Sequence, residues 1–350
     1  MRSSVAAFPL LSSAVDGSGT LRGNRQATSG VKGAMKRFAP VLLVVLLALA
    51  GCARLLGTSP GSPGSSGDGA SPSAHDAGTI DHPTGSEPIL VVTSEGGMVP
   101  VQMQVANVPL FILLGDGRVI LPGAQIMIFP GPALPALQER RLNEDGIQAV
   151  LEAVEATELF ADDLDLRAAG NVIADATDTV FTLDADSRQV RVSAYALGAI
   201  SSLTTGELPA GVTPADVDAD RALRQLMDDL TGIDATVPAD GWEAGDWQPY
   251  EPEALRLYAS DRTGQAVDGG EDPTGQVLHW PTDDDPATFG EEVEAFIDGT
   301  RCATVTGDDA AAWYTALNEA NQQTLWTTDG DDRWLVQARP LLPHEEVACP

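Results

Sequence analysis

The segment FILLGDGRVIL, residues 111–121, carries the clearest structural pattern in this chain of 350 residues. Two apolar runs, residues 111–114 and 118–121, flank a Gly-Asp-Gly sequence of the kind that joins antiparallel strands. A Gly-x-Gly sequence also occurs in nucleotide-binding loops, but such a loop leads into a helix and contains a third glycine, which is missing here. The segment therefore predicts a β-hairpin rather than a nucleotide site.

Further strands are expected on both sides of this hairpin. Residues 89–92 form a short apolar run, and residues 101–105 alternate apolar and polar side chains with the period of two that is typical of a strand. Residues 179–195 predict a second hairpin, whose turn lies at 184–187. The folded part of the chain is therefore expected to contain antiparallel hairpins.

Two helices are expected among these strands. Asn143 is the expected N-cap of the first, and acidic residues follow it in the first turn, where negative charge favours the helix dipole. The apolar stripe of this helix consists of Ile147, Val150, Leu151 and Val154. A second amphipathic helix is expected from Asp220 to Leu230, with its leucines facing inward.

The C-terminal part of the chain repeats this order of elements. A strand at 302–305 leads to a helix that Thr306 is expected to cap, with Asp309 three residues later in a pattern close to a capping box. The helix has an apolar stripe of Ala310, Trp313, Tyr314 and Leu317, which aligns with the stripe of the first helix at an offset of 163 residues. Residues 324–333 match 179–188 with five identities. The sequence therefore predicts an α+β fold of two small, related units, each with antiparallel hairpins packed on a capped helix.

Residues 35–52 have the layout of an export signal. Met35-Lys36-Arg37 supplies positive charge, and the apolar run that follows, residues 38–50, is too short to span a bilayer as a helix. The run ends in Leu49-Ala50-Gly51-Cys52, which resembles the lipobox of bacterial lipoproteins. The resemblance implies that Cys52 carries a diacylglycerol thioether and becomes the N-terminus after cleavage. It also implies a protein anchored by lipid to the bacterial cell membrane and facing outside the cytoplasm.

Composition divides the chain into four segments. Residues 1–51 are expected to be an N-terminal extension and signal peptide, with Met1 and Met35 both open as translation starts. Residues 52–87 are rich in Ser, Gly and Pro and are expected to form a disordered tether. A first α+β domain is expected over 88–235 and a second over 236–350, because Pro and Gly punctuate the polar segment between them.

The charge of the chain excludes several classes of function. Its formal net charge is −31, and of its 20 basic and 51 acidic residues, 14 arginines and 50 acids follow residue 51, with no lysine. Enzymes that depend on a lysine, such as those with a Walker-type phosphate loop or a Schiff base, are therefore excluded for the mature chain. The acidic excess argues against a nucleic-acid partner. The expected partners are the membrane, through the N-terminal lipid, and an envelope protein or glycan.

Three cysteines occur in the chain, at positions 52, 302 and 349. If Cys52 carries lipid, Cys302 and Cys349 remain as an even pair in an exported protein, where oxidation is permitted. These two cysteines are therefore expected to form a disulfide.

No metal site or cofactor is expected. His344 opens a sequence that begins like a zinc protease motif, but Ala348 stands where the second histidine is required. Asp216 opens a sequence that begins like a calcium loop, but its sixth residue is Arg221 in place of glycine.

One group of aromatic residues is a candidate ligand surface. Its members are Trp242, Trp247, Tyr250, Tyr258 and Trp280. They are expected either to fill the seam between the two domains, which the sequence favours, or to form a platform for a glycan. Because no nucleophile or general base stands out, the expected function is a non-enzymatic binding or scaffolding module. A carboxylate-dependent hydrolase of cell-wall polymers and a solute-binding receptor are the alternatives.

Overall fold

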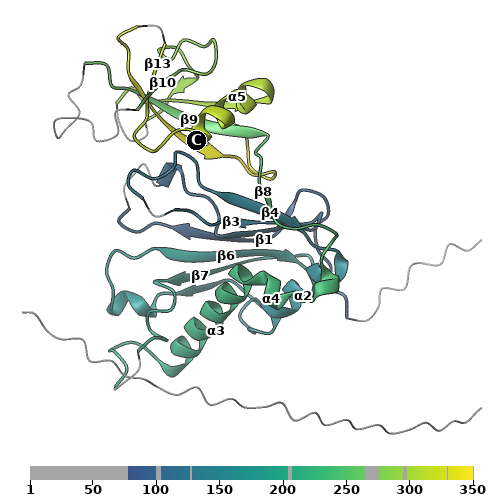
Figure 1. Ribbon diagram of the computed structural model, residues 1–350. Coiled ribbons are helices and arrows are strands. Elements are labelled where there is room, and N and C mark those ends of the chain that lie inside the picture. The colour runs from purple at the N-terminus through teal and green to yellow at the C-terminus, as the bar shows by residue number, and fades with distance from the viewer. Residues whose placement is uncertain are drawn as a thin grey trace, which may run out of the picture. The chain divides into compact units, whose positions relative to one another are not determined.

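Two β-sheets and four α-helices build the part of the chain that the computed structural model describes, which shows an α+β fold made of two sheet units (Figure 1). The described residues are 78–99, 104–126, 128–203, 207–264, 276–294, 298–328 and 330–349.

The first sheet has eight strands in the order β5-β7-β6-β1-β2-β3-β4-β8. Their bounds are β1 Pro88–Glu95, β2 Phe111–Leu114, β3 Arg118–Pro122, β4 Leu137–Arg141, β5 Leu164–Leu166, β6 Asp178–Ala185, β7 Arg188–Tyr195 and β8 Gln248–Pro249. Neighbouring strands are antiparallel except for β5 and β7. The hairpins β2–β3 and β6–β7 confirm the two hairpin predictions. Gly117 has φ +82° in the first turn, and a Cβ there would lie 2.2 Å from the carbonyl oxygen of Leu142, so only glycine fits.

Strands β2 and β3 are buried on both faces of this sheet. Phe111 and Leu113 face the main core, whereas Ile112 and Leu114 face a second cluster on the opposite side. Successive side chains of a strand point to opposite faces, so an unbroken apolar run requires cover on both. The main core contains residues of the helices, and the second cluster includes Tyr250 and Leu342 from the C-terminal half of the chain.

The helices α2 (Glu144–Glu155), α3 (Pro214–Thr231) and α4 (Ile233–Thr236) contribute to the main core. Asn143 caps α2 as expected, because its side chain accepts a hydrogen bond of 3.0 Å from the backbone N–H of Gly146. Helix α3 begins six residues before the predicted start at Asp220. Its start follows from a capping box between Thr213 and Asp216 with Pro214 in the first turn, a signal that lies outside the apolar stripe. Two short 3₁₀ helices, Ala168–Asn171 and Ala239–Gly241, complete this half.

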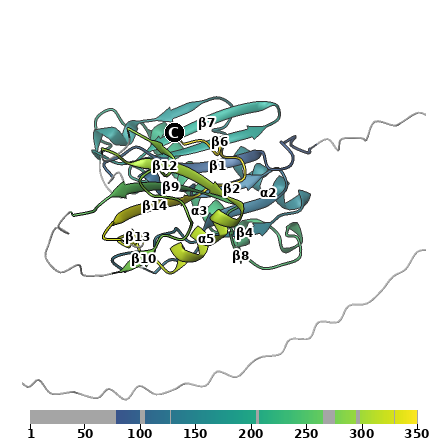
Figure 2. The same ribbon diagram turned by 90° about the horizontal axis from the view of Figure 1, so that it is seen from above.

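The second sheet has six strands in the order β10-β13-β14-β9-β12-β11. Their bounds are β9 Ala254–Asp261, β10 Val277–His279, β11 Glu291–Glu292, β12 Arg301–Thr306, β13 Leu325–Thr327 and β14 Trp334–Pro340. Figure 2 shows β14, β9 and β12 side by side in the sheet. The second sheet has a core of its own, here called the second core, to which helix α5 (Gly307–Asn318) contributes Trp313. The ring centroid of Trp313 lies 4.8 Å from that of Trp280 and 5.0 Å from that of Trp326.

In both units, a strand, a helix and a hairpin follow one another along the chain. The position of that hairpin within its sheet differs between the two units. In the first sheet, the first strand of the hairpin after the helix, β6, pairs with β1. In the second sheet, the second strand of the corresponding hairpin, β14, pairs with β9. Thr306 occupies the N-cap position of α5, but its side chain makes no capping hydrogen bond, so the predicted capping box is not formed.

Two segment predictions are corrected by the structure. Ile80, which was expected in the disordered tether, is buried in the main core, and its backbone N–H and C=O each pair at 2.9 Å with the side chain of Gln148. The fold therefore begins before Pro88. Gln104 and Val105 lie in a helical turn, not in the predicted strand, and the rest of that strand is outside the described residues. Along the chain, the last strand of the first sheet ends at Pro249, and the first strand of the second sheet begins at Ala254.

Candidate functional site

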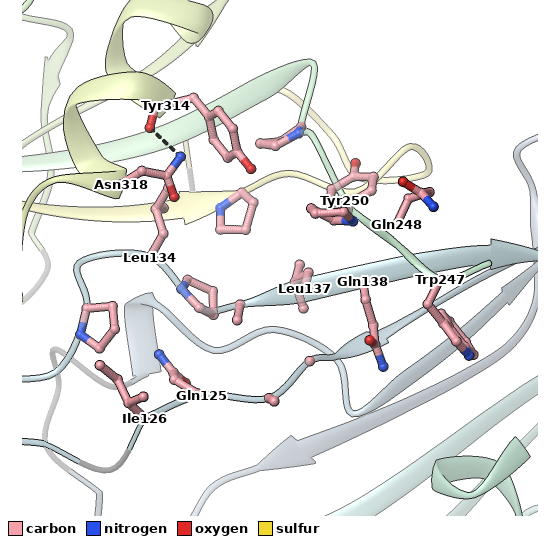
Figure 3. Close-up of a pocket in the computed structure, with 18 residues that line it drawn as sticks. Gln125, Ile126, Leu134, Leu137, Gln138, Trp247, Gln248, Tyr250, Tyr314 and Asn318 are labelled. Carbon is pink, nitrogen blue, oxygen red and sulfur yellow. Dashed lines mark hydrogen bonds between the residues drawn. The ribbon is translucent and has the colours of Figure 1, made fainter.

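A cleft of about 470 Å³ is lined by segments of both sheet units (Figure 3). One side comes from the loop before β4, from β4 itself and from the segment around β8, and the other includes two side chains of α5 and the end of β14. A volume of about 300–1,000 Å³ is usual for sites that bind small molecules. The cleft is therefore large enough to hold a ligand.

The loop between β3 and β4 builds one wall of the cleft by reaching the second core. Leu134 of this loop is buried there. The backbone N–H of Ala133 donates to the carbonyl of Ala320 at 3.2 Å, and the N–H of Gln322 donates to the carbonyl of Gly131 at 2.9 Å. Proline occurs repeatedly in this loop and restricts its backbone. The wall is therefore held in place by packing and by main-chain hydrogen bonds.

Tyr250 and Trp247 are fixed at the opposite end of the lining. The hydroxyl of Tyr250 donates to the carbonyl of Leu341 at 2.9 Å, and burial, with the nearby Glu139 carboxylate, raises the pKa of this phenol. The phenol thus remains a neutral donor. The indole N–H of Trp247 donates to Asp234 at 2.9 Å, and its ring packs edge-on against Trp242 with centroids 5.6 Å apart.

None of the 18 residues that line the cleft is charged, although 20% of the chain is charged and its net charge is −31. The polar side-chain groups in the lining are amides, phenols and the indole N–H of Trp247. Four amide side chains contribute, those of Gln125, Gln138, Gln248 and Asn318, and Figure 3 shows them spread around the opening. Within the described part of the chain, the side chains of Gln125 and Gln138 and the hydroxyl of Tyr314 have no hydrogen-bond partner. These groups are available to a ligand.

The five predicted aromatic residues do not come together in one surface. Trp247 and Tyr250 line the cleft, but Trp242 is buried in the main core beneath the guanidinium of Arg140, which lies 4.1 Å from its ring centroid. Tyr258 packs beside Cys302, and Trp280 lies in the second core. Each core uses the large apolar area of an aromatic ring, which separates residues that are close in sequence.

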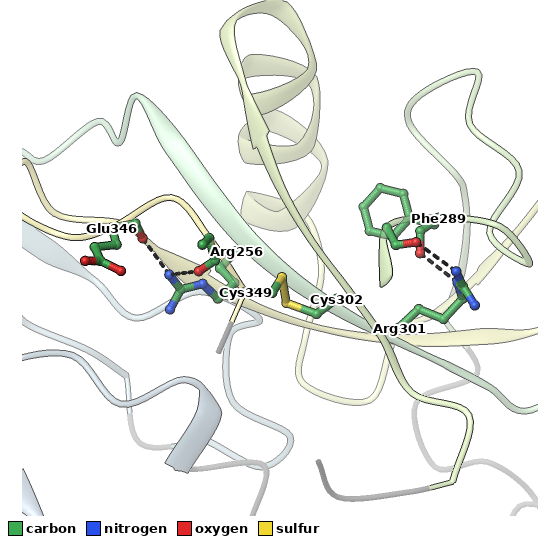
Figure 4. Close-up of a disulfide and its surroundings, with 8 residues drawn as sticks. Arg256, Phe289, Arg301, Cys302, Glu346 and Cys349 are labelled. Atoms are coloured by element: carbon green, nitrogen blue, oxygen red, sulfur yellow. Dashed lines mark hydrogen bonds between the residues drawn. A yellow bond between two sulfur atoms is a disulfide. The ribbon is translucent and has the colours of Figure 1, made fainter. Parts of the chain in front are cut away.

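The predicted disulfide between Cys302 and Cys349 is present, with the two Cα atoms 6.1 Å apart (Figure 4). Arg256 lies beside it and donates to the carbonyls of Glu346 at 2.6 Å and Ala348 at 2.7 Å. The disulfide and this arginine therefore hold the C-terminal tail against the second sheet. Cys52, the expected site of the lipid, lies outside the described residues.

Most of the residues that line the cleft were not expected from the sequence. Gln125, Gln138 and Asn318 were not among the predicted site residues. Tyr314 was expected as an apolar position of the C-terminal helix, and it packs against the second core as well as lining the cleft. One signal was available, because residues 119–138 contain no Asp, Glu, Lys, Arg or His in a strongly acidic chain. This uncharged segment provides the loop and the strand end that line the cleft.

The side chains that line the cleft offer hydrogen bonds and apolar contact. The lining includes no Asp, Glu, His, Cys, Ser, Thr, Lys or Arg, so it provides no carboxylate or imidazole for acid–base catalysis and no serine, threonine or cysteine nucleophile. In the described ranges, no three His, Cys, Asp or Glu side chains are grouped to hold a metal ion. Comparison with protein-family models, with curated proteins and with solved structures found no match for this chain.

Proposed function

We propose that this protein is a lipid-anchored, extracytoplasmic binding module that takes an uncharged ligand into the cleft beside β4 and α5. The anchor and its location rest on the lipobox resemblance at Cys52. The uncharged lining of the cleft is the observation that carries the binding function.

An uncharged ligand is favoured by the charge of the whole protein together with that of the cleft. The part of the chain that follows residue 51 has 14 arginines against 50 acids, and its negative field repels anions from the surface. A cation is attracted to the surface, but inside the cleft it would lose hydration without gaining a carboxylate partner from the lining. A neutral molecule is not repelled by the negative field and loses no hydration of a charge when it enters the cleft.

Binding is favoured over hydrolysis by the same lining. A glycosidase of the usual kind needs two carboxyl groups on either side of the bond that is cleaved. No carboxyl group lines this cleft, and burial raises the pKa of the Tyr250 phenol. The cleft is therefore suited to hold a ligand without transforming it.

The proposal is tested by fractionating an envelope extract into neutral, anionic and cationic components by ion exchange. Each fraction is added to the purified protein, and the thermal unfolding midpoint is measured. The neutral fraction is expected to raise the midpoint, because a ligand that binds only the folded state stabilises it. The Tyr314→Ala variant is expected to lose this increase.

Gln225→Ala is the matched control, because Gln225 is an exposed residue of α3 outside the cleft lining. This variant is expected to respond like the wild type. A midpoint increase that only a charged fraction produces, or one that Tyr314→Ala retains in full, contradicts the proposal.

A further inference from the structure

We infer that the ligand of the cleft is a neutral oligosaccharide. This inference rests on the proposed function and narrows its ligand to one chemical class. It is carried by amide groups without partners, by rigidly held aromatic rings and by the scarcity of main-chain donors at the neighbouring sheet edge.

The unengaged amides select a ligand that both donates and accepts hydrogen bonds. Gln125 and Gln138 line the cleft and have no side-chain partner within the described residues. Asn318 uses one amide N–H, which donates to the carbonyl of Tyr314 at 2.9 Å. An apolar ligand would cover these groups and leave them unpaired, which is unfavourable. Sugar hydroxyls act as donors and acceptors, as do side-chain amides.

The aromatic rings provide the apolar part of such a site. A pyranose ring presents a face of C–H groups between its hydroxyls, and a flat aromatic ring can pack against that face. Trp247 is already held by its hydrogen bond to Asp234 and by its contact with Trp242, and Tyr314 projects from the regular helix α5. Side chains that are ordered before binding lose little conformational entropy when the ligand arrives. Figure 3 shows Trp247 beside Gln138 and Tyr314 beside Asn318.

An extended peptide is a less suitable occupant. Peptides commonly add to an open sheet edge through main-chain hydrogen bonds. The edge here is β8, which has two residues, and its second residue, Pro249, has no N–H to donate. A proline-rich peptide brings few N–H groups of its own, so the carbonyl oxygens of Gln125 and Gln138 would stay unpaired.

Exposed apolar side chains near the rim are the main argument for a more apolar ligand. Ile126, Ile128 and Phe129 are 65%, 60% and 80% exposed. Of these three, only Ile126 lines the cleft, where five prolines, two alanines and two leucines add apolar surface beside the four amides. The ligand must therefore offer apolar contact as well as hydrogen bonds, as the C–H face and the hydroxyls of a sugar do.

The inference is tested by saturation-transfer NMR and titration calorimetry with named probes. The neutral probes are tetrasaccharides of glucose, galactose, mannose, arabinose and N-acetylglucosamine. The comparison probes are a galacturonic acid tetramer, a proline-rich decapeptide and a hydrophobic decapeptide without charge. At least one neutral saccharide is expected to bind, and Gln138→Ala and Tyr314→Ala are each expected to weaken its binding at least tenfold.

Two control variants separate local from general effects. Gln225→Ala and Phe129→Ser are expected to bind the saccharide within twofold of the wild type, because neither residue lines the cleft. Circular dichroism and the unfolding midpoint establish that each variant is folded. Loss of saccharide binding in Phe129→Ser overturns the assignment to the amide-lined cleft.

The remaining outcomes distinguish this inference from the proposed function. Binding of a decapeptide but of no saccharide overturns the oligosaccharide while leaving an uncharged-ligand module. The same holds if no saccharide in the panel binds although the neutral envelope fraction stabilises the protein. Preferred binding of the acidic tetramer, or no stabilisation by any probe or by the neutral fraction, overturns both.

Discussion

At the scale of single residues, burial determines which of the many acids have a structural role. Asp220 is 1% exposed and is the only acidic residue that is fully buried in the described ranges. Its carboxylate accepts hydrogen bonds of 2.9 Å from the backbone N–H groups of Gly198 and Ser201, and so joins their loop to α3. From the sequence, this aspartate was expected to begin the second helix and to belong to an incomplete calcium motif. Its structural role depends on two backbone N–H groups that lie 22 and 19 residues away in the sequence.

Asp220→Ala is expected to lower the free energy of unfolding by about 3 kcal/mol, because it leaves two main-chain N–H groups without their charged acceptor. Asp220→Asn retains a carbonyl acceptor and is expected to lose about half as much. Urea unfolding measures both changes. Asp218→Ala, on the exposed face of the same helix, is expected to change stability by less than about 0.5 kcal/mol. Equal losses at positions 218 and 220 would contradict the role given to Asp220.

His344 is expected to make stability depend on pH. Burial lowers the pKa of His344 below its usual value, although the Glu345 carboxylate acts in the opposite direction. Its Nδ1 atom is buried without a hydrogen-bond partner in the described part of the chain. As the pH falls below about 6.5, the unfolded chain binds a proton before the folded chain does, so stability is lost.

The measurement for this prediction is the urea midpoint at several pH values between 7.5 and 5, compared with His344→Gln. The variant is expected to lose less stability than the wild type over this interval, because glutamine does not titrate. Parallel pH profiles for the two proteins would show that His344 is not responsible.

At the scale of elements, the two helix starts at Thr213 and Thr306 differ although both place threonine at the N-cap. The Thr213 side chain accepts a hydrogen bond from the backbone N–H of Asp216, whose carboxylate accepts one from the N–H of Thr213 in return. The Thr306 side chain makes no such bond. A sequence pattern identifies the residue at a helix start, but the orientation of its side chain depends on the local backbone.

Thr213→Ala is therefore expected to lower the free energy of unfolding by about 1 kcal/mol, which is typical for removing an N-cap side chain. Thr306→Ala is the matched substitution and is expected to cost less than about 0.5 kcal/mol. Chemical unfolding of both variants under one condition gives the comparison. A loss at Thr306 that equals or exceeds the loss at Thr213 would contradict the capping geometry.

At the scale of the whole molecule, the C-terminal tail contacts residues of both sheet units. Leu342 is buried in the cluster that covers the face of the first sheet opposite the main core. Cys349 is bonded to Cys302 in β12. Arg339 of β14 also donates to the carbonyl of Asn107 at 2.7 Å. The tail thus adds contacts between segments that are far apart in the sequence.

Replacing Cys302 and Cys349 together by serine is expected to lower the free energy of unfolding by up to about 4 kcal/mol. The disulfide closes a loop over a sequence separation of 47 residues, and without it the unfolded chain gains conformational entropy. Urea unfolding of the oxidised protein and the double variant measures the difference. Equal stability of the two proteins, with the wild type verified as oxidised by mass spectrometry, would refute this role.

The proposed lipid anchor at Cys52 can be tested by membrane fractionation of cells. Cys52→Ser removes the thiol that the lipobox resemblance requires, so the variant is expected to leave the membrane fraction or to accumulate as uncut precursor. Two acyl chains are enough for stable membrane attachment, and their loss is expected to be plain in fractionation. None of the helices in the described ranges combines the length and apolar composition needed to cross a bilayer. Unchanged membrane association of the Cys52→Ser variant would exclude lipid attachment at this residue.

The sequence by itself determined the α+β class, the hairpins, the cap of α2 and the pairing of Cys302 with Cys349. These features follow from apolar patterns, turn glycines and residue counts, which act over short distances or need no geometry. Only the tertiary structure decided that Trp242 and Trp280 serve separate cores while Trp247 lines a cleft, and that Tyr314 faces this cleft. The physical reason is that the lining comes from segments between residues 123 and 340, and their meeting depends on how two sheets and a helix pack.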